Sequence, residues 1–193
     1  MTDFFRKYYA PGNASLVVAG DINRADARRK IEHWFSDVKA GAPVEPLKVP
    51  AAVLGGVVKE TLTDQVQLPR IYLAWLTPGL YKPGDAELDV VSGILTGGKN
   101  SRLYKRLVYD MQIAQDVSAT QNSSKEDSIY TIVVTARPSQ DSAAEVLARI
   151  TAVVDEELER LRAAPPDARE LDRVKNSIEA SFLPQADKLR LLS

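Results

Sequence analysis

The hydrophobic and polar positions of this chain alternate between strand-like and helix-like periods. Short apolar or alternating runs predict strands at Ala14–Ala19, Val57–Thr63, Arg70–Leu76, Ala114–Gln121 and Ser128–Ala136. Apolar residues at helical spacing predict helices near 23–36, 85–96, 101–108, 141–163 and 166–182. Because most strands occur in adjacent pairs, the pattern predicts an α+β fold: an antiparallel or mixed sheet with helices packed on one face.

Two of these elements carry specific burial predictions. The run Arg70–Leu76 places apolar side chains on both of its faces, which indicates that both faces of this strand are at least partly covered. The last helix has a stripe predicted to be buried, formed by Leu171, Val174, Ile178 and Phe182.

A stretch rich in helix and strand breakers divides the chain. Gly41, Pro43, Pro46 and Pro50 lie close together, and neither a helix nor a central strand tolerates that density of breakers. We therefore predict a linker over residues 39–55, which separates a segment at 1–38 from a domain at 56–193.

Composition narrows the classes of partner. Lys and Arg (25) nearly balance Asp and Glu (26) over 193 residues, so no strong field favours nucleic acid or an anionic membrane. No apolar run reaches the roughly 18 residues of a spanning helix. The sequence predicts neither a nucleic-acid nor a membrane partner, and the absence of cysteine leaves the cellular compartment open.

Metal chemistry has little support in these residues. A catalytic zinc ion normally takes three protein ligands, whereas His33 is the only histidine and there is no cysteine. His33 lies at the edge of an amphipathic helix, where a solvated surface histidine is the better interpretation. We therefore predict no metal site and no catalytic residue in this segment.

Two other motifs have structural explanations. Residues 93–101 nearly match a phosphate-binding loop, but Asn100 replaces the required Ser or Thr, and a helix rather than a strand precedes the loop. Within the acidic run 155–159, Glu156 lies four residues before Arg160, which favours a salt-bridged helix face over metal or acid chemistry.

Two segments together resemble a known family. Residues 5–21 (FRKYYAPGNASLVVAGD) and residues 97–107 (GGKNSRLYKRL) are similar to two motifs of the pitrilysin/insulinase-type zinc peptidases, which include the mitochondrial processing peptidases. The motifs occur in the same order, and the resemblance spans essentially the whole chain. It implies a fold like that of the LuxS and processing-peptidase metallohydrolases.

The resemblance also implies an assembly. In this family a zinc domain with a His-x-x-Glu-His motif precedes a homologous domain without zinc, and two such halves close around a peptide substrate. Residues 1–38 resemble the final strand and helix of the zinc domain, and 56–193 resemble the non-catalytic second domain. The implied partners are thus the zinc domain, a second homologous half and a peptide, with zinc bound outside this segment. The resemblance slightly favours an exported, periplasmic bacterial compartment.

The family also supplies a candidate peptide site. An arginine and a tyrosine that bind substrate in the partner half fall on Val108 and Gln115, so that role is not transferred. Some members hold the N-terminus of a substrate on an edge strand of this domain. The corresponding residues are Val117, Ser118, Ala119, Thr120 and Gln121, beside Gly97 and Gly98.

The resemblance leaves two functions open. The first is the non-catalytic domain of a zinc metalloendopeptidase, which helps to form the peptide-binding chamber and has no peptidase activity by itself. The alternative is an inactive scaffold or partner subunit of the same family. A His-x-x-Glu-His motif upstream in the gene distinguishes the two.

Overall fold

The computed structural model describes residues 1–46 and 48–190, with side chains up to Phe182. The chain forms two compact units. The first comprises Met1–Val49 together with the residues from Ser181 onward, and the second comprises Pro50–Ala180. The division between Val49 and Pro50 falls inside the predicted linker, where residues 39–46 and 48–55 have neither helix nor strand. The proposed domain limits at 38 and 55 stay a prediction.

The first unit consists of short helices joined by extended chain. It contains α1 (Thr2–Tyr8), a 3-10 turn at Pro11–Asn13 and α2 (Arg24–Phe35). The predicted helix at 23–36 is confirmed: the side chain of Asn23 accepts a hydrogen bond from the Asp26 amide at 3.1 Å and so caps α2. Neither α1 nor α2 has a buried residue.

The strand predicted at Ala14–Ala19 is wrong for this structure. These residues belong to no helix or sheet, and the side chain of Val17 is 85% exposed. A strand is defined by a ladder of hydrogen bonds to a neighbour, and in the described chain this segment has no ladder partner.

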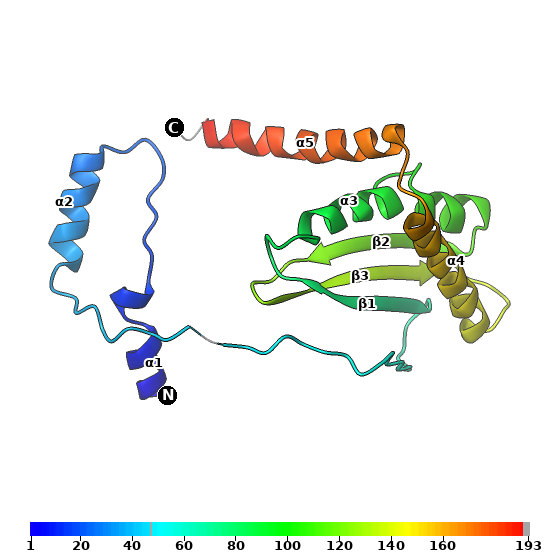
Figure 1. Cartoon of the computed structure of the whole chain (residues 1–193), viewed down its shortest axis with the longest axis horizontal. Helices are drawn as coiled ribbons and strands as arrows, with labels where there is room; N and C mark the ends of the chain where they lie inside the picture. Colours follow the sequence, from blue (N-terminus) through cyan, green and yellow to red (C-terminus); the bar gives the residue numbers. More distant parts are fainter. Residues whose placement is uncertain (47, 191–193) are drawn as a thin grey trace. The chain divides into compact units, whose positions relative to one another are not determined.

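The second unit is built on an antiparallel sheet of three strands (Figure 1). These are β1 (Arg70–Pro78), β2 (Ala114–Asn122) and β3 (Asp127–Ala136), in the spatial order β1-β3-β2. The register aligns Tyr72 with Val133, and Val133 with Ser118. The α+β class and the β2–β3 hairpin are confirmed. The strand predicted at Val57–Thr63 is wrong, because that segment pairs with no strand among the described residues and Val57 is 87% exposed.

The helices of the second unit follow the predicted order. They are α3 (Asp85–Thr96), a π-helix η2 (Tyr104–Asp110), α4 (Ala143–Ala163) and the part of α5 (Ala168–Arg190) up to Ala180. Ser142 and Glu145 form a reciprocal cap at the start of α4, and Asp167 accepts a hydrogen bond from the Glu170 amide at 2.8 Å at the start of α5. None of the helices in the described residues is long and apolar enough to cross a membrane.

The helices cover only one face of the sheet. The buried core joins that face to the helices and includes Leu95, Leu103, Leu107, Ile132, Val134, Ile150 and Val154. The other face is exposed: Tyr72 on β1 is 63% exposed, so the prediction that both faces of this strand are at least partly covered is wrong. In α5, Val174 is buried as predicted, whereas Phe182 is 64% exposed.

Candidate functional site

The five predicted site residues of β2 divide between the two faces of the sheet. Val117, Ala119 and Gln121 point toward the helices, where Val117 and Gln121 are buried and Ala119 is partly buried. Ser118 and Thr120 point to the open face and are exposed. This alternation follows from the two-residue period of a strand.

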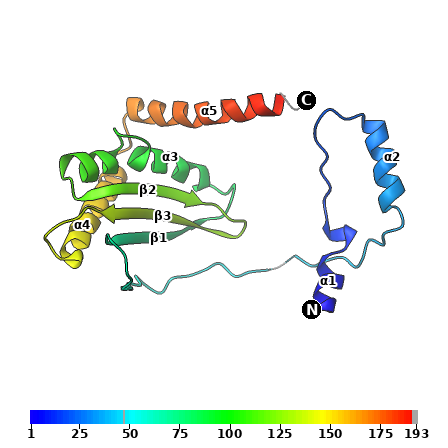
Figure 2. The same cartoon turned by 180° about the vertical axis from the view of Figure 1, so that it is seen from behind.

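The outer edge of β2 is next to α3. Both views show α3 running along β2, on the side away from β3 (Figures 1 and 2). The amide N–H of Ala119 points away from β3 and donates to Thr96 Oγ1 at 3.0 Å. Because hydrogen-bonding direction alternates along an antiparallel strand, the backbone groups of Val117 and Gln121 face the same edge.

Gly97 and Gly98 end α3 beside this edge. The carbonyl oxygen of Gly97 accepts a hydrogen bond from Arg173 Nη1 at 2.6 Å. A Cβ added at Gly97 would lie 2.5 Å from the Gly93 carbonyl oxygen, so glycine is needed there for close packing. Gly98 has a φ of +92° and open space around it, which fits a helix-ending glycine. The structure therefore brings both glycines next to Thr96 and gives Gly97 a packing role.

The side chain of Gln121 is held in a buried polar cluster. Its Nε2 donates to Asp85 Oδ1 at 3.0 Å, and its Oε1 accepts from Thr77 Oγ1 at 3.1 Å. Asp85 also accepts from Ser123 Oγ at 2.6 Å and from the Tyr81 amide at 2.9 Å. The hydrogen bonds from Ser123, Gln121 and the Tyr81 amide lower the pKa of the Asp85 carboxyl below its usual value. This cluster ties the end of β2 to the start of α3.

The lowered pKa of Asp85 predicts an acid-sensitive contribution to stability. The unfolded chain binds the proton more tightly than the folded chain, so the contribution is complete above the usual aspartate pKa of about 4 and is lost as the pH falls through the folded-state pKa. We expect Asp85→Asn to flatten the decrease in unfolding free energy below about pH 5. Urea titrations at several pH values measure this, with Asp172→Asn on the exposed side of α5 as control. Parallel curves for wild type and Asp85→Asn would contradict the expectation.

The open face of the sheet combines apolar and hydroxyl side chains. The register places Tyr72, Val133 and Ser118 in one row, Ala74, Thr131 and Thr120 in the next, and Leu76, Ile129 and Asn122 in the third. Arg70 and Asp116 flank Thr135 at one end, where Arg70 Nε donates to Thr135 Oγ1 at 3.1 Å. The three rows contain no charged side chain, so this face suits extended, largely uncharged chain.

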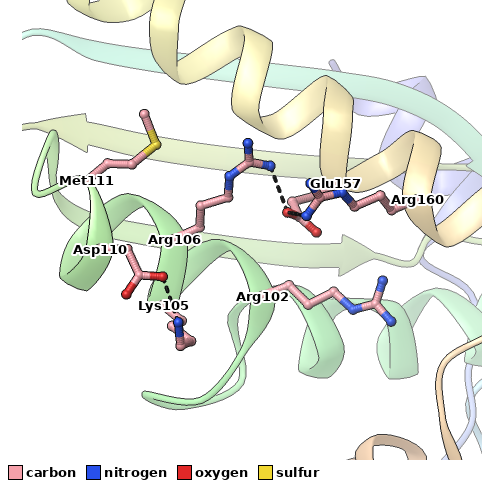
Figure 3. A pocket seen from close by; sticks show the side chains of 7 residues that line it. All are labelled: Arg102, Lys105, Arg106, Asp110, Met111, Glu157 and Arg160. Carbon is pink, nitrogen blue, oxygen red and sulfur yellow. Dashed lines mark hydrogen bonds and ion pairs between the residues drawn. The ribbon is translucent and has the colours of Figure 1, made fainter.

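A charged hollow lies between η2 and α4 (Figure 3). Glu157 is only 4% exposed and accepts hydrogen bonds from Arg106 Nη1 at 2.8 Å and from Arg160 Nη1 at 2.9 Å. Glu156 pairs with the same two arginines, as the predicted Glu156–Arg160 bridge requires. Lys105 Nζ lies 2.6 Å from Asp110 Oδ2. Because these cations already have carboxylate partners, the hollow serves to join helices.

The side chains of the family-like motif at residues 97–107 have structural roles. Ser101 is fully buried and its hydroxyl donates to the Gly98 carbonyl at 2.6 Å. Arg102 makes a two-point ion pair with Glu170 of α5, at 2.8 and 2.6 Å. Leu103 and Leu107 are fully buried in the core. The motif thus connects η2 to α5, and residues 93–96, which resembled part of a phosphate-binding loop, belong to α3.

Sequence reasoning missed three long-range contacts: Thr96 with Ala119, Asp85 with Gln121, and Arg106 with Glu157. The partners in these contacts lie between 23 and 51 residues apart along the chain, and only the fold brings them together. The turn residues before Asp85 indicated the start of a helix but gave no sign of its contact with Gln121.

The described part of the chain contains no cluster of metal-binding side chains. Among residues 1–46 and 48–182, whose side chains the structure describes, no three His, Cys, Asp or Glu side chains are grouped so that they could hold a metal ion. His33 is exposed on α2, with its ring 4.9 Å from that of Trp34.

Comparison with protein families identifies the chain. The family model described as the Peptidase M16 inactive domain matches residues 1–178. The chain therefore belongs to this family of non-catalytic domains related to zinc peptidases, as the two sequence motifs implied.

Two curated relatives are bacterial. The chain is 25% identical over 184 residues to a protein named zinc protease PqqE of Helicobacter pylori (strain ATCC 700392 / 26695), covering 93% of this chain and 40% of the relative. It is 22% identical over 183 residues to a protein named uncharacterized zinc protease YmxG of Bacillus subtilis (strain 168), covering 95% and 42%. The chain thus spans about two fifths of the length of these relatives.

Solved structures show the same fold. A protease from Helicobacter pylori superposes with a TM-score of 0.71 at 23% identity, covering 95% of this chain and 44% of that chain. A peptidase M16 inactive domain from Pseudomonas fluorescens superposes with a TM-score of 0.68 at 22% identity, covering 99% and 44%.

Proposed function

We propose that this chain is the non-catalytic part of a bacterial zinc metalloendopeptidase and forms part of the wall of a peptide-binding chamber. The observation that carries the proposal is the one-sided sheet, whose helices cover one face and leave Tyr72, Ala74 and Leu76 of β1 exposed on the other. A face with apolar side chains and hydroxyl groups contacts extended peptide without requiring one sequence. The names of the two curated relatives support the connection to zinc proteases.

The proposal includes partners outside the 193 residues. Zinc and its His-x-x-Glu-His ligands belong to a homologous zinc domain, and a second homologous half closes the chamber. Residues 1–38 are proposed to complete the zinc domain, which accounts for the apolar side chains that α1 and the extended segment expose, such as Phe4, Phe5 and Val17. In the zinc domain a metal-activated water and a glutamate base would perform hydrolysis.

Reading the coding sequence that adjoins this segment tests the catalytic part of the proposal. A His-x-x-Glu-His motif some hundred or more residues upstream supports the peptidase. Its absence from an uninterrupted reading frame supports the alternative, an inactive scaffold or partner subunit. An exported compartment stays a prediction from the family resemblance.

We expect this chain, expressed without a tag, to bind no stoichiometric zinc and to cleave no peptide. The reason is that His33 is the only histidine and is exposed on α2. Elemental analysis of the purified chain, with a fluorogenic peptide assay in parallel, measures both properties. Close to one zinc ion per chain would overturn the expectation.

Peptide contact with the open face predicts an effect of charge on binding. Ser118→Lys combined with Thr120→Lys introduces two charges into the uncharged rows and should weaken binding of an unfolded peptide by roughly tenfold, which is about 1.4 kcal/mol. Fluorescence anisotropy with a labelled peptide of about ten residues, threonine alternating with valine and two terminal lysines, measures the affinity.

The control carries the same added charge elsewhere. Ala148→Lys combined with Ala152→Lys places two lysines on the exposed side of α4. If both double variants stay folded and bind the peptide with wild-type affinity, the open face has no part in binding. The control also shows how much of any change arises from net charge alone.

A further inference from the structure

We propose that Thr96 controls access to the edge of β2, because its hydroxyl occupies the position where a paired peptide strand would place a carbonyl oxygen. The inference rests on the proposed peptide-binding function and adds to it a residue that regulates one part of the site. The edge concerned is the one that carries the backbone groups of Val117, Ala119 and Gln121.

The hydroxyl of Thr96 both accepts and donates a hydrogen bond. Its oxygen accepts from the Ala119 amide at 3.0 Å, and its hydrogen is donated to the Ser92 carbonyl of the preceding helical turn at 3.1 Å. The Ala119 amide, which is the middle donor on the outer edge of the predicted site, therefore already has a hydrogen-bond acceptor. A side-chain oxygen at about 3 Å from an edge amide does what the carbonyl of a neighbouring strand does in a ladder.

The turn that carries Thr96 is fixed in place. Arg173 of α5 donates to the carbonyl oxygens of Gly97 at 2.6 Å and of Gly93 at 3.5 Å. Val174 packs against Gly93, where an added Cβ would lie 2.4 Å from Val174 Cγ1. The helix is therefore held close to β2, and the smallest movement that frees the Ala119 amide is rotation of the Thr96 side chain. Threonine in a helix has two accessible χ1 states, which makes this rotation feasible.

The hydrogen bond from the Ala119 amide to Thr96 Oγ1, which forms a cap on the edge of β2, has two consequences for a peptide at this edge. A strand that pairs along the full length of β2 must first displace the Thr96 hydroxyl from Ala119, which reduces its affinity. Unpaired edge strands also associate with one another, and covering the edge prevents this. Thr96 thus reserves the edge for ligands that compete successfully with an internal hydrogen bond.

The test compares Thr96→Val, which keeps the shape of the side chain and removes the acceptor, with Thr96→Ser, which keeps the acceptor. Binding of the threonine–valine peptide is measured by fluorescence anisotropy with the 193-residue chain, and exchange of the Ala119 amide with deuterium by NMR. We expect Thr96→Val to bind the peptide roughly 2- to 10-fold more tightly, the range that a single neutral hydrogen bond allows, and Thr96→Ser to resemble wild type. The Ala119 amide should exchange faster in Thr96→Val only.

The outcomes separate the two proposals. Unchanged exchange of the Ala119 amide in Thr96→Val would overturn the cap itself, whatever the peptide does. Peptide binding to wild type that Thr96→Val does not strengthen would overturn the control by Thr96 and leave peptide binding in place. Absence of binding to every variant would overturn the peptide-binding proposal and with it the regulation. Thr96→Ala gives a second removal of the acceptor if Thr96→Val does not fold.

Discussion

Alanine in place of Glu157 should lower the free energy of unfolding of the Pro50–Ala180 unit by about 3 kcal/mol. The carboxylate is 4% exposed and is shared by Arg106 and Arg160, so its removal leaves two guanidinium groups with fewer partners, one of them largely buried. Glu156 retains contacts with both arginines, which keeps the expected loss at the low end for a broken buried ion pair. Urea unfolding followed by the fluorescence of Trp75 measures the loss, in a Trp34→Phe background that leaves only the second unit visible.

A surface ion pair on the same helix supplies the control. Glu159 pairs with Arg162, and both side chains are about two-thirds exposed, so Glu159→Ala should cost less than about 1 kcal/mol. Glu157→Gln keeps part of the hydrogen bonding and should fall between the two. Equal losses of unfolding free energy for Glu157→Ala and Glu159→Ala would show that the buried network stabilises the unit no more than a surface ion pair does.

The helices and the β2–β3 hairpin were predictable because their signals are local. Asn23, Ser142 and Asp167 each accept a hydrogen bond from an amide three residues further along and so cap a helix without any distant partner. The hairpin joins strands separated by a short polar turn, so its pairing requires no distant partner. The family was predictable for a different reason, because the two motifs at 5–21 and 97–107 occur in the right order.

The two strands that were predicted wrongly show that local composition alone does not determine whether a strand forms. Ala14–Ala19 and Val57–Thr63 have the apolar, β-branched composition of strands, yet neither pairs with another strand in the described chain. Composition reports that a segment suits a sheet, whereas a strand forms only where a neighbouring backbone is available. The face of β1 was mistaken for a related reason: its apolar side chains indicate contact with something, and in this unit no helix covers Tyr72.

The candidate site was predictable only in outline. The sequence placed Val117–Gln121 on a strand beside Gly97 and Gly98, and the structure agrees with that neighbourhood. The sequence could not show that Gln121 donates a hydrogen bond to Asp85 or that Ala119 donates one to Thr96, because both contacts depend on how α3 packs along β2. The exposed residues of this segment are Ser118 and Thr120, which makes the open face rather than the edge the accessible part of the site.

Alanine at Gly93 should destabilise the second unit by about 2 kcal/mol, although alanine in place of a helical glycine ordinarily stabilises by about 0.5–1 kcal/mol. The added Cβ would lie 2.4 Å from Val174 Cγ1, and Val174 is a stiff, buried side chain with little room to move. The glycine that resembled part of a phosphate-binding loop is thus explained by the close approach of α3 and α5. Urea unfolding monitored through Trp75 measures the sign as well as the size of the change.

A double-mutant cycle separates the contact between residues 93 and 174 from the other effects of Gly93→Ala. Val174→Ala alone should cost about 1–3 kcal/mol through lost burial, and it also removes the two methyl groups closest to the new Cβ. In the Gly93→Ala/Val174→Ala variant the clash is gone and the helix gains the better residue, so the double variant should be at least 1 kcal/mol more stable than the sum of the two single changes predicts. Additive losses would mean that Gly93 is not held to glycine by Val174.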